Sequence, residues 1–198
     1  MFTQKNISDS MSFEEYFQLS KKLVENKDSS GENKSEAYVN YTKLSFTRMK
    51  RILKTTKIRE SILYQLEDLN KPITLLVFSE SWCGDAAQCI PVFQKMLENN
   101  SNINIRILLR DEHPDVMDQY LTNGSKSIPK IIALDWQLNE LGTWGPQPQF
   151  LDNWYKEERK NPTMQTMELK EQFQHWYTKD KGVTLQNEMI DLLEEWNK

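Results

Sequence analysis

Two short apolar runs with a helical segment between them limit what this chain can fold into. The run 73–78 contains one polar residue, Thr74, and the run 103–109 alternates in part with period two, so both predict strands. The pattern of 85–99 predicts a helix, which Pro91 should kink because proline lacks an amide donor and clashes with the preceding turn. A strand, a helix and a strand in succession imply that the two strands pair in parallel.

The next part of the chain adds a helix and a hairpin to this unit. A second helix should begin at Pro114, where a missing N–H costs nothing, and end near Asn123 and Gly124. The runs 131–134 and 141–145, joined by a few polar residues, predict two antiparallel strands. The chain is therefore expected to be an α/β protein with a central mixed four-stranded sheet and helices on both faces.

Both ends of the chain show helical patterns. Between residues 12 and 69, apolar side chains recur at helical spacing in two stripes, separated by a polar loop at 27–33. Residues 185–196 form another apolar stripe, and 150–160 is expected to be helical or irregular surface structure. We therefore predict an N-terminal helical extension over residues 1–70 that packs on a core domain over 71–198, which carries extra helices at its C-terminal end.

Composition excludes several classes of function. The net charge is −4, from 25 basic and 29 acidic residues, and no basic block stands out, so nucleic acid is not an expected partner. The apolar runs are much shorter than the roughly 20 residues of a membrane-spanning helix, and the first residues lack the features of a secretory signal. We therefore expect a cytoplasmic protein with no membrane partner.

The two cysteines direct attention to thiol chemistry. Two cysteines cannot form a disulfide framework, and an exposed cysteine in a reducing compartment is more often reactive than bridged. Cys83 follows a predicted strand and opens a predicted helix. The first amides of a helix lack intrahelical partners and carry the positive end of its dipole, so a sulfur there is stabilised as thiolate, the nucleophilic form.

Four landmarks around Cys83 resemble the thioredoxin superfamily. They are Trp82-Cys83-Gly84 with the helix-kinking Pro91, Asp111-Glu112-His113-Pro114 before a helix, Ser127-Ile128-Pro129 before a strand, and Trp144-Gly145. The segment WCGDAAQ, Arg110-Asp111-Glu112 and Gly142 to Pro146 resemble a little-described bacterial branch of thioredoxin-like proteins. The resemblance implies a thioredoxin-like three-layer sandwich, with Cys83 as nucleophile and with Ile128, a cis Pro129 and Gly145 beside the substrate.

The sequence departs from the family at two positions. Ordinary thioredoxins have a second, resolving cysteine where this chain has Ala86, and a buried aspartate where it has Val77. Cys89 cannot replace the missing thiol in an intact helix. Six residues rise about 9 Å and turn about 240°, whereas a disulfide needs Cα atoms about 4.4–6.8 Å apart. We therefore expect Cys89 to be a core residue. The alternative is that Cys89 becomes a partner for Cys83 if the helix end unwinds.

The side chains next to Cys83 each allow two interpretations. Asp85 would cap amides of the first helical turn, although its charge would oppose ionisation of Cys83. Arg110, at the end of a predicted strand, would pair with Asp85 or the thiolate, or else be solvated. Trp82 would offer an apolar face to a substrate or pack half-buried. Gly84 completes the turn.

The remaining candidate ligands do not gather. His113 and His175 are isolated from each other and from the cysteines, so no metal site is expected, and no cofactor is implied.

The resemblance implies a cis Pro129, but Pro129 could also be an ordinary trans proline before a strand.

Three hypotheses for function follow. The first is a thiol-disulfide oxidoreductase of monothiol type, in which Cys83 attacks a disulfide and an external thiol resolves the mixed disulfide. Its partners would be protein or small-molecule disulfides or thiols. The second is a non-catalytic interaction module on a thioredoxin scaffold. The third, an unreactive cysteine kept for packing, requires Cys83 to be buried, which its place in a loop-to-helix turn argues against.

Overall fold

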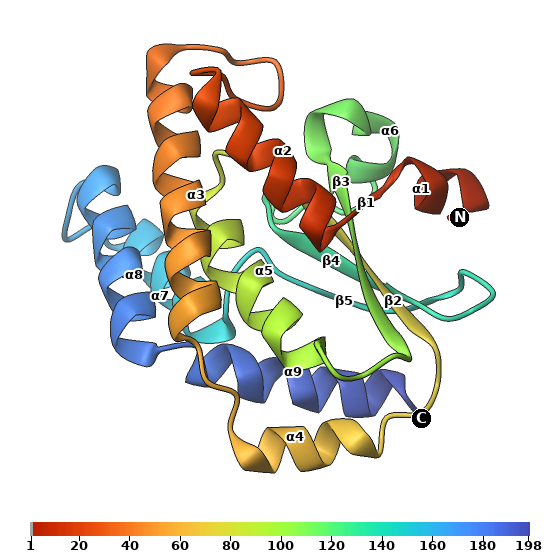
Figure 1. Ribbon diagram of the computed structural model, residues 1–198. Helices are drawn as coiled ribbons and strands as arrows, with labels where there is room; N and C mark the ends of the chain where they lie inside the picture. The colour runs from red at the N-terminus through yellow and green to blue at the C-terminus, as the bar shows by residue number, and fades with distance from the viewer. Residues whose placement is uncertain (1) are drawn as a thin grey trace.

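The computed structural model describes residues 2–198 and shows a five-stranded mixed sheet with helices around it (Figure 1). The strands are β1 (Met11–Ser12), β2 (Ile73–Ser79), β3 (Ile103–Leu109), β4 (Lys130–Leu134) and β5 (Glu140–Trp144). Their order in the sheet is β1-β3-β2-β4-β5, with β2 and β3 parallel and the other pairs antiparallel. The expected α/β class and mixed sheet are confirmed, with one strand more than the four predicted.

The helices occupy both ends of the chain and the crossovers of the sheet. They are α1 (Gln4–Asp9), α2 (Phe13–Glu25), α3 (Glu36–Thr55), α4 (Glu60–Glu67), α5 (Gly84–Leu97), α6 (Pro114–Met117), α7 (Gln149–Lys160), α8 (Thr166–Asp180) and α9 (Val183–Trp196). Pro91 lies inside α5, as expected. None of the helices in residues 2–198 combines the length and the apolar character that crossing a membrane would require.

The additional strand, β1, is short because a helix begins directly after it. Ser12 ends β1 and is also the N-cap of α2. Its Oγ accepts a hydrogen bond from the amide of Glu15 at 3.2 Å, and the Glu15 carboxylate accepts one from the amide of Ser12 at 2.7 Å. This capping box fixes where α2 begins. A strand of two residues has no periodicity, so the apolar pattern could not predict it.

The second crossover helix is much shorter than predicted. α6 ends at Met117, whereas the sequence suggested a helix that continues to Asn123 and Gly124. Those two residues instead have positive φ values of 52° and 76°. They form a tight turn in which Thr122 and Ser125 exchange backbone hydrogen bonds of 2.9 and 3.0 Å. The Asn-Gly pair, which also occurs at helix ends, here makes a two-residue hairpin turn.

α5 lies at the centre of the helical packing. It starts where the buried strand β2 ends, and both α3 and α9 pack against it. Figure 1 shows α3 running beside α5, with α9 and α4 below them. The helices at the two ends of the chain therefore meet on the helix that begins next to Cys83.

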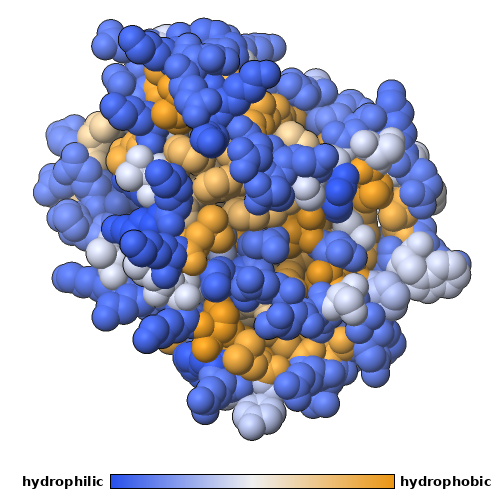
Figure 2. Space-filling view, in the orientation of Figure 1, coloured by the Kyte–Doolittle hydropathy of each residue, from blue (hydrophilic) through white to orange (hydrophobic). Residues whose placement is uncertain are grey.

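The surface of this face is mixed. Figure 2 shows mostly hydrophilic residues, with apolar residues gathered in the middle and lower parts of the view. Tyr41 and Leu44 of α3 are among the large apolar side chains that reach the surface, with exposed fractions of 42% and 46%. Segment 150–160, left open as helical or irregular, forms most of helix α7.

Candidate functional site

Cys83 is the N-cap of α5, at the turn where β2 leads into the helix. Its Sγ accepts a hydrogen bond from the amide of Ala86 at 3.4 Å. The same thiol donates to the carbonyl oxygen of Ile128 at 3.3 Å. β4 lies next to β2 in the sheet, and this pairing brings the loop before β4 to the turn after β2. The predicted meeting of Cys83 with the Ile128–Pro129 loop is thus present, and the Ile128–Pro129 bond is cis as predicted.

The Cys83 thiol is buried, contrary to the expectation from its place in a turn. Only 6% of the residue is exposed. Burial, followed by the negative charge of Asp85, raises the pKa of Cys83 to about 12, although the amides of Ala86 and Asp85 and the charge of Arg110 oppose this shift. The helix N-terminus does contribute stabilisation of the thiolate, as expected, but desolvation outweighs it. The resting thiol is therefore protonated at neutral pH.

Asp85 lies in the first turn of α5 but does not cap it. Its Oδ1 is enclosed and has no hydrogen-bond partner within residues 2–198. Desolvation raises the pKa of Asp85 to about 6, and the Tyr177 hydroxyl and the positive charges of Arg48 and Lys170 act in the opposite direction. The capping role is taken by the sulfur of Cys83.

The sequence allowed an ion pair between Arg110 and Asp85, but in the structure Arg110 pairs with a different carboxylate. Its Nη2 lies 2.7 Å from Oδ1 of the adjacent Asp111, and its Nε donates to the same oxygen at 2.8 Å. The guanidinium group also lies 5.0 Å from the ring of Trp82, whose other neighbour is the ring of Tyr38 at 5.0 Å. Trp82 is half-buried, and the Tyr38 ring meets it edge to face at an interplanar angle of 70°. Arg110 therefore forms a wall of the site.

Helices from both ends of the chain reach the turn between β2 and α5, named here the Cys83 turn, at Gly84. A Cβ atom built on Gly84 would lie 3.2 Å from Nη1 of Arg48 in α3 and 3.5 Å from Nε2 of Gln174 in α8. Gln174 also accepts a hydrogen bond of 2.8 Å from Gln88 of α5. The absence of a side chain at Gly84 lets these two helices approach the turn.

Cys89 is a core residue, as predicted. It is fully buried, its Sγ lies 3.6 Å from the hydroxyl of Tyr177, and both cysteines are free thiols. Gly145, on the other side of the site, has a φ of 109°. A Cβ there would overlap the carbonyl oxygen of Pro129, so a glycine is required where the two loops meet.

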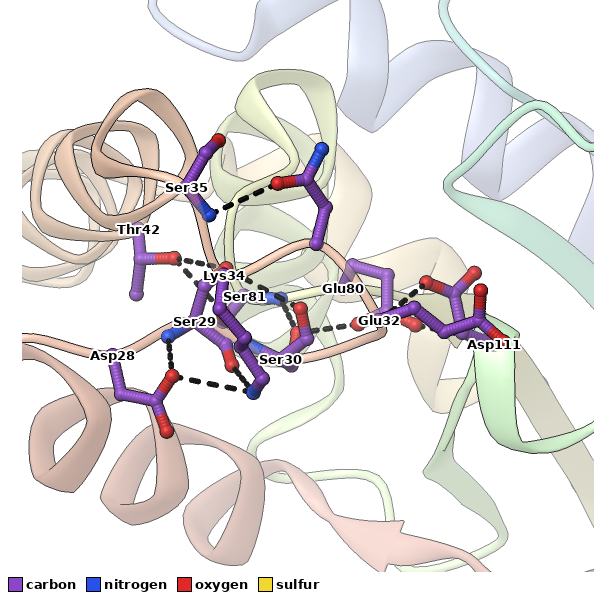
Figure 3. A network of polar contacts seen from close by, with 11 residues as sticks. Asp28, Ser29, Ser30, Glu32, Lys34, Ser35, Thr42, Glu80, Ser81 and Asp111 are labelled. Atoms are coloured by element: carbon purple, nitrogen blue, oxygen red, sulfur yellow. Dashed lines mark hydrogen bonds and ion pairs between the residues drawn. The ribbon is translucent and has the colours of Figure 1, made fainter.

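A buried carboxylate that the sequence patterns did not single out lies next to the turn between β2 and α5 (Figure 3). Glu80 is fully buried three residues before Cys83, and one of its oxygens accepts a hydrogen bond from the amide of Asp111 at 2.9 Å. The other oxygen accepts from the hydroxyl of Ser30. Burial raises the pKa of Glu80, although these hydrogen bonds favour its charged form.

The same network connects the loop between α2 and α3 to the Cys83 turn. Ser30 Oγ accepts from the amide of Ser81 at 2.7 Å, and Ser81 Oγ accepts from the amide of Ser30 at 3.0 Å. Thr42 of α3 lies within 3.1 Å of the Ser81 hydroxyl. The only sequence signal for this network was a charged residue at the end of an apolar strand, because the residues that contact one another in it are 31 to 51 positions apart in the chain.

Metal ligands do not gather in the described part of the chain. Residues 2–198 contain no group of three or more histidine, cysteine, aspartate or glutamate side chains that could hold a metal ion. The chemistry available at the site is that of one thiol, held between a helix N-terminus and a backbone carbonyl, with an aromatic ring and an arginine beside it.

Fold and site together define a thioredoxin-like protein with a single cysteine in the turn that opens α5. A family model described as Thioredoxin matches residues 31–160. This match covers more than half of the chain, and the chain belongs to the thioredoxin family. No curated protein matches it.

Two solved structures resemble the whole chain. One is an HIV epitope-scaffold and the other is a protein of unknown function from Pseudomonas aeruginosa, at 14% and 16% sequence identity respectively. In each case the TM-score is 0.66 and the alignment covers 98% of both chains. At this level of identity the likeness extends to the fold alone.

Proposed function

We propose that this protein is a thiol-disulfide oxidoreductase of monothiol type with Cys83 as its nucleophile. The observation that carries the proposal is the position of the Cys83 sulfur, which contacts both the Ala86 amide and the carbonyl oxygen of Ile128 in the cis-proline loop. That position places one sulfur next to a backbone amide that favours its thiolate and next to a loop that can frame a bound chain.

The reaction conserves electrons through two exchanges. Cys83 first loses its proton to solvent, and the thiolate attacks one sulfur of a substrate disulfide. The substrate S–S bond breaks as the mixed disulfide forms, and the departing thiolate takes up a proton. An external thiol then attacks the substrate sulfur of the mixed disulfide, so that the bond to Cys83 breaks, Cys83 leaves as a thiolate and a new disulfide joins the external thiol to that half of the substrate. A further external thiol cleaves this new disulfide, so that two external thiols supply the two electrons. Ala86 stands where a resolving thiol would otherwise do this.

The surrounding residues have defined tasks in this proposal. Trp82, held between Tyr38 and Arg110, offers an apolar face beside the sulfur. Ile128, Pro129 and Gly145 would frame a bound substrate, because the Ile128 carbonyl contacts the Cys83 thiol and Gly145 lies against Pro129. The substrates are disulfides or thiols of proteins or small molecules, and the cytoplasm, expected from the sequence, would supply the resolving thiol. No cofactor or metal takes part.

A second candidate function, a non-catalytic interaction module, is favoured by the burial of the same thiol. A cysteine that is 6% exposed, with its pKa raised to about 12, attacks disulfides slowly unless the site opens. The two candidates differ in whether the folded protein accepts a thiol on Cys83.

Trapping of a mixed disulfide separates the candidates. The Cys89→Ser protein, treated with diamide and a small thiol at pH 8, should gain one adduct on Cys83, as seen by intact-mass and peptide mass spectrometry. The matched Cys83→Ser protein should gain none. Absence of an adduct on the folded Cys89→Ser protein, together with a full adduct after unfolding in urea, would favour the interaction module.

A further inference from the structure

The second half of α3 and the residues after it carry an unusual concentration of positive charge. No acidic residue occurs between Glu36 and Glu60, whereas seven basic residues lie between positions 43 and 59. They are Lys43, Arg48, Lys50, Arg51, Lys54, Lys57 and Arg59. The net charge of −4 conceals this segment, which is a basic block that the overall composition did not reveal.

Three of these cations share one face of the helix. Lys43, Lys50 and Lys54 are separated by seven and four positions, which places them within about 40° of one another around the helix axis, and Arg51 is about 100° from Lys50. These four residues and Lys57, just beyond the helix, are all exposed. We name these five residues the basic stripe. Over its helical part it extends about 17 Å, since each residue of a helix adds about 1.5 Å.

The positive charges of the basic stripe are not neutralised within the protein. Among residues 2–198, no ion pair involves any of the five, although lysines elsewhere pair with neighbouring carboxylates, as Lys95 does with Glu98. Lys50 and Lys54, four positions apart, repel each other, and like charges at this spacing destabilise a helix by a few tenths of a kcal/mol. An unneutralised stripe on an otherwise acidic protein is suited to an anionic partner.

The position of the stripe indicates what kind of anion it meets. Around the axis of α3, Arg51 and Leu44 lie between the three lysines and Arg48, which is about 140° from Lys43. Arg48 reaches the turn before α5 at Gly84, so the exposed side of α3 extends from the lysines round to the neighbourhood of Cys83. Tyr41 and Leu44 are exposed on the same helix and offer apolar contacts, which a folded or extended polypeptide can match. The acidic remainder of the molecule would repel a long polyanion such as nucleic acid or an anionic membrane.

We propose that the exposed face of α3 formed by the basic stripe, Tyr41 and Leu44 is a docking surface for an acidic polypeptide segment of a partner protein. The choice of a protein over other anions rests in part on the proposed function, in which that partner presents its disulfide or thiol to Cys83. The docking itself uses no atom of the thiol.

Fluorescence anisotropy with labelled peptides tests the docking surface. A glutamate-rich peptide containing two leucines should bind the Cys89→Ser protein, whereas the same peptide with glutamine in place of glutamate should bind at least about tenfold more weakly. The binding should weaken with added salt, because exposed charges are screened over about 10 Å at 0.1 M. The Cys83→Ser protein should bind the acidic peptide equally well, which separates this proposal from the proposed function.

Charge reversal provides the matched control. Lys43→Glu/Lys50→Glu/Lys54→Glu should lose at least about tenfold in affinity, while Lys5→Glu/Lys22→Glu/Lys179→Glu, with the same change of net charge on other elements, should stay within about threefold. The corresponding glutamine substitutions replace either triple variant that fails to fold. Equal binding of the two peptides, equal losses in the two triple variants, or tighter binding of single-stranded DNA or phosphatidylserine vesicles than of the peptide would overturn the proposal.

Discussion

Asp85 and Cys83 lie within one turn of each other, and the charge of the first opposes ionisation of the second. The carboxyl group itself is unfavourably placed, because Oδ1 is enclosed without a hydrogen-bond partner and burial raises the pKa to about 6. A group whose pKa is higher in the folded protein binds its proton more tightly there. Its contribution to stability is complete below the unfolded value of 3.8 and is lost as the pH rises through about 6.

Asp85→Asn should therefore stabilise the protein at pH 7, by about 1 kcal/mol, because the side chain is partly accessible to solvent and the full pKa shift overstates the gain. Urea unfolding at pH 4 and pH 7 measures this, and the benefit should appear mainly at the higher pH. The same change should speed alkylation of Cys83 by removing a negative charge. The control is Asp115→Asn, an exposed carboxylate on α6. If Asp85→Asn stabilised the protein equally at both pH values, the raised pKa of Asp85 in the folded protein would be contradicted.

At the scale of elements, the loop between α2 and α3 is part of the site. Gly31 in this loop has a φ of 74°, and a Cβ there would overlap Oδ2 of Asp111 and lie 3.3 Å from Oε2 of Glu80. Gly124 has nearly the same φ, 76°, but nothing lies within 4 Å of its Cβ position. The two glycines thus share the cost of a left-handed backbone and differ in packing.

Gly124→Ala should cost about 1 kcal/mol of unfolding free energy, the usual penalty of a left-handed alanine, and Gly31→Ala should cost about 2–3 kcal/mol. Only Gly31→Ala should alter the surroundings of Trp82, because Asp111 holds the Arg110 that lies over that ring. Urea titrations give the energies, and quenching of tryptophan fluorescence by acrylamide, with Trp82→Phe as reference, gives the second effect. Equal losses of unfolding free energy in the two variants would mean that Gly31 is not packed tightly against Asp111.

The strands of the core could be predicted because their signal is local. The runs at 73–78 and 103–109 are apolar because β2 and β3 lie in the middle of the sheet, and the helix between them follows from its own periodicity. α6 was predicted too long, since an Asn-Gly pair is compatible with both a helix end and a hairpin turn. The boundary near residue 70 between extension and core stays a prediction.

At the scale of the whole molecule, the site is closed by segments that are distant in sequence. The motifs shared with the thioredoxin superfamily placed Cys83 beside Ile128 and Pro129 correctly. They could not show that Arg48 of α3 and Gln174 of α8 meet at Gly84, or that Ser30 binds Glu80, because such contacts depend on tertiary packing. For the same reason the burial of Cys83 was not foreseen. The thioredoxin scaffold is therefore modified here chiefly by its helical additions.

The central claim is that Cys83 exchanges with disulfides in the folded protein, and its reaction with 4,4′-dithiodipyridine tests it most directly. In the Cys89→Ser protein, one equivalent should react without denaturant, and the rate constant should rise about tenfold per pH unit from pH 7 to 10, because the pKa of the thiol is raised to about 12. The Cys83→Ser/Cys89→Ser protein should not react. No reaction before urea unfolds the protein would contradict the claim and leave Cys83 as a packing residue.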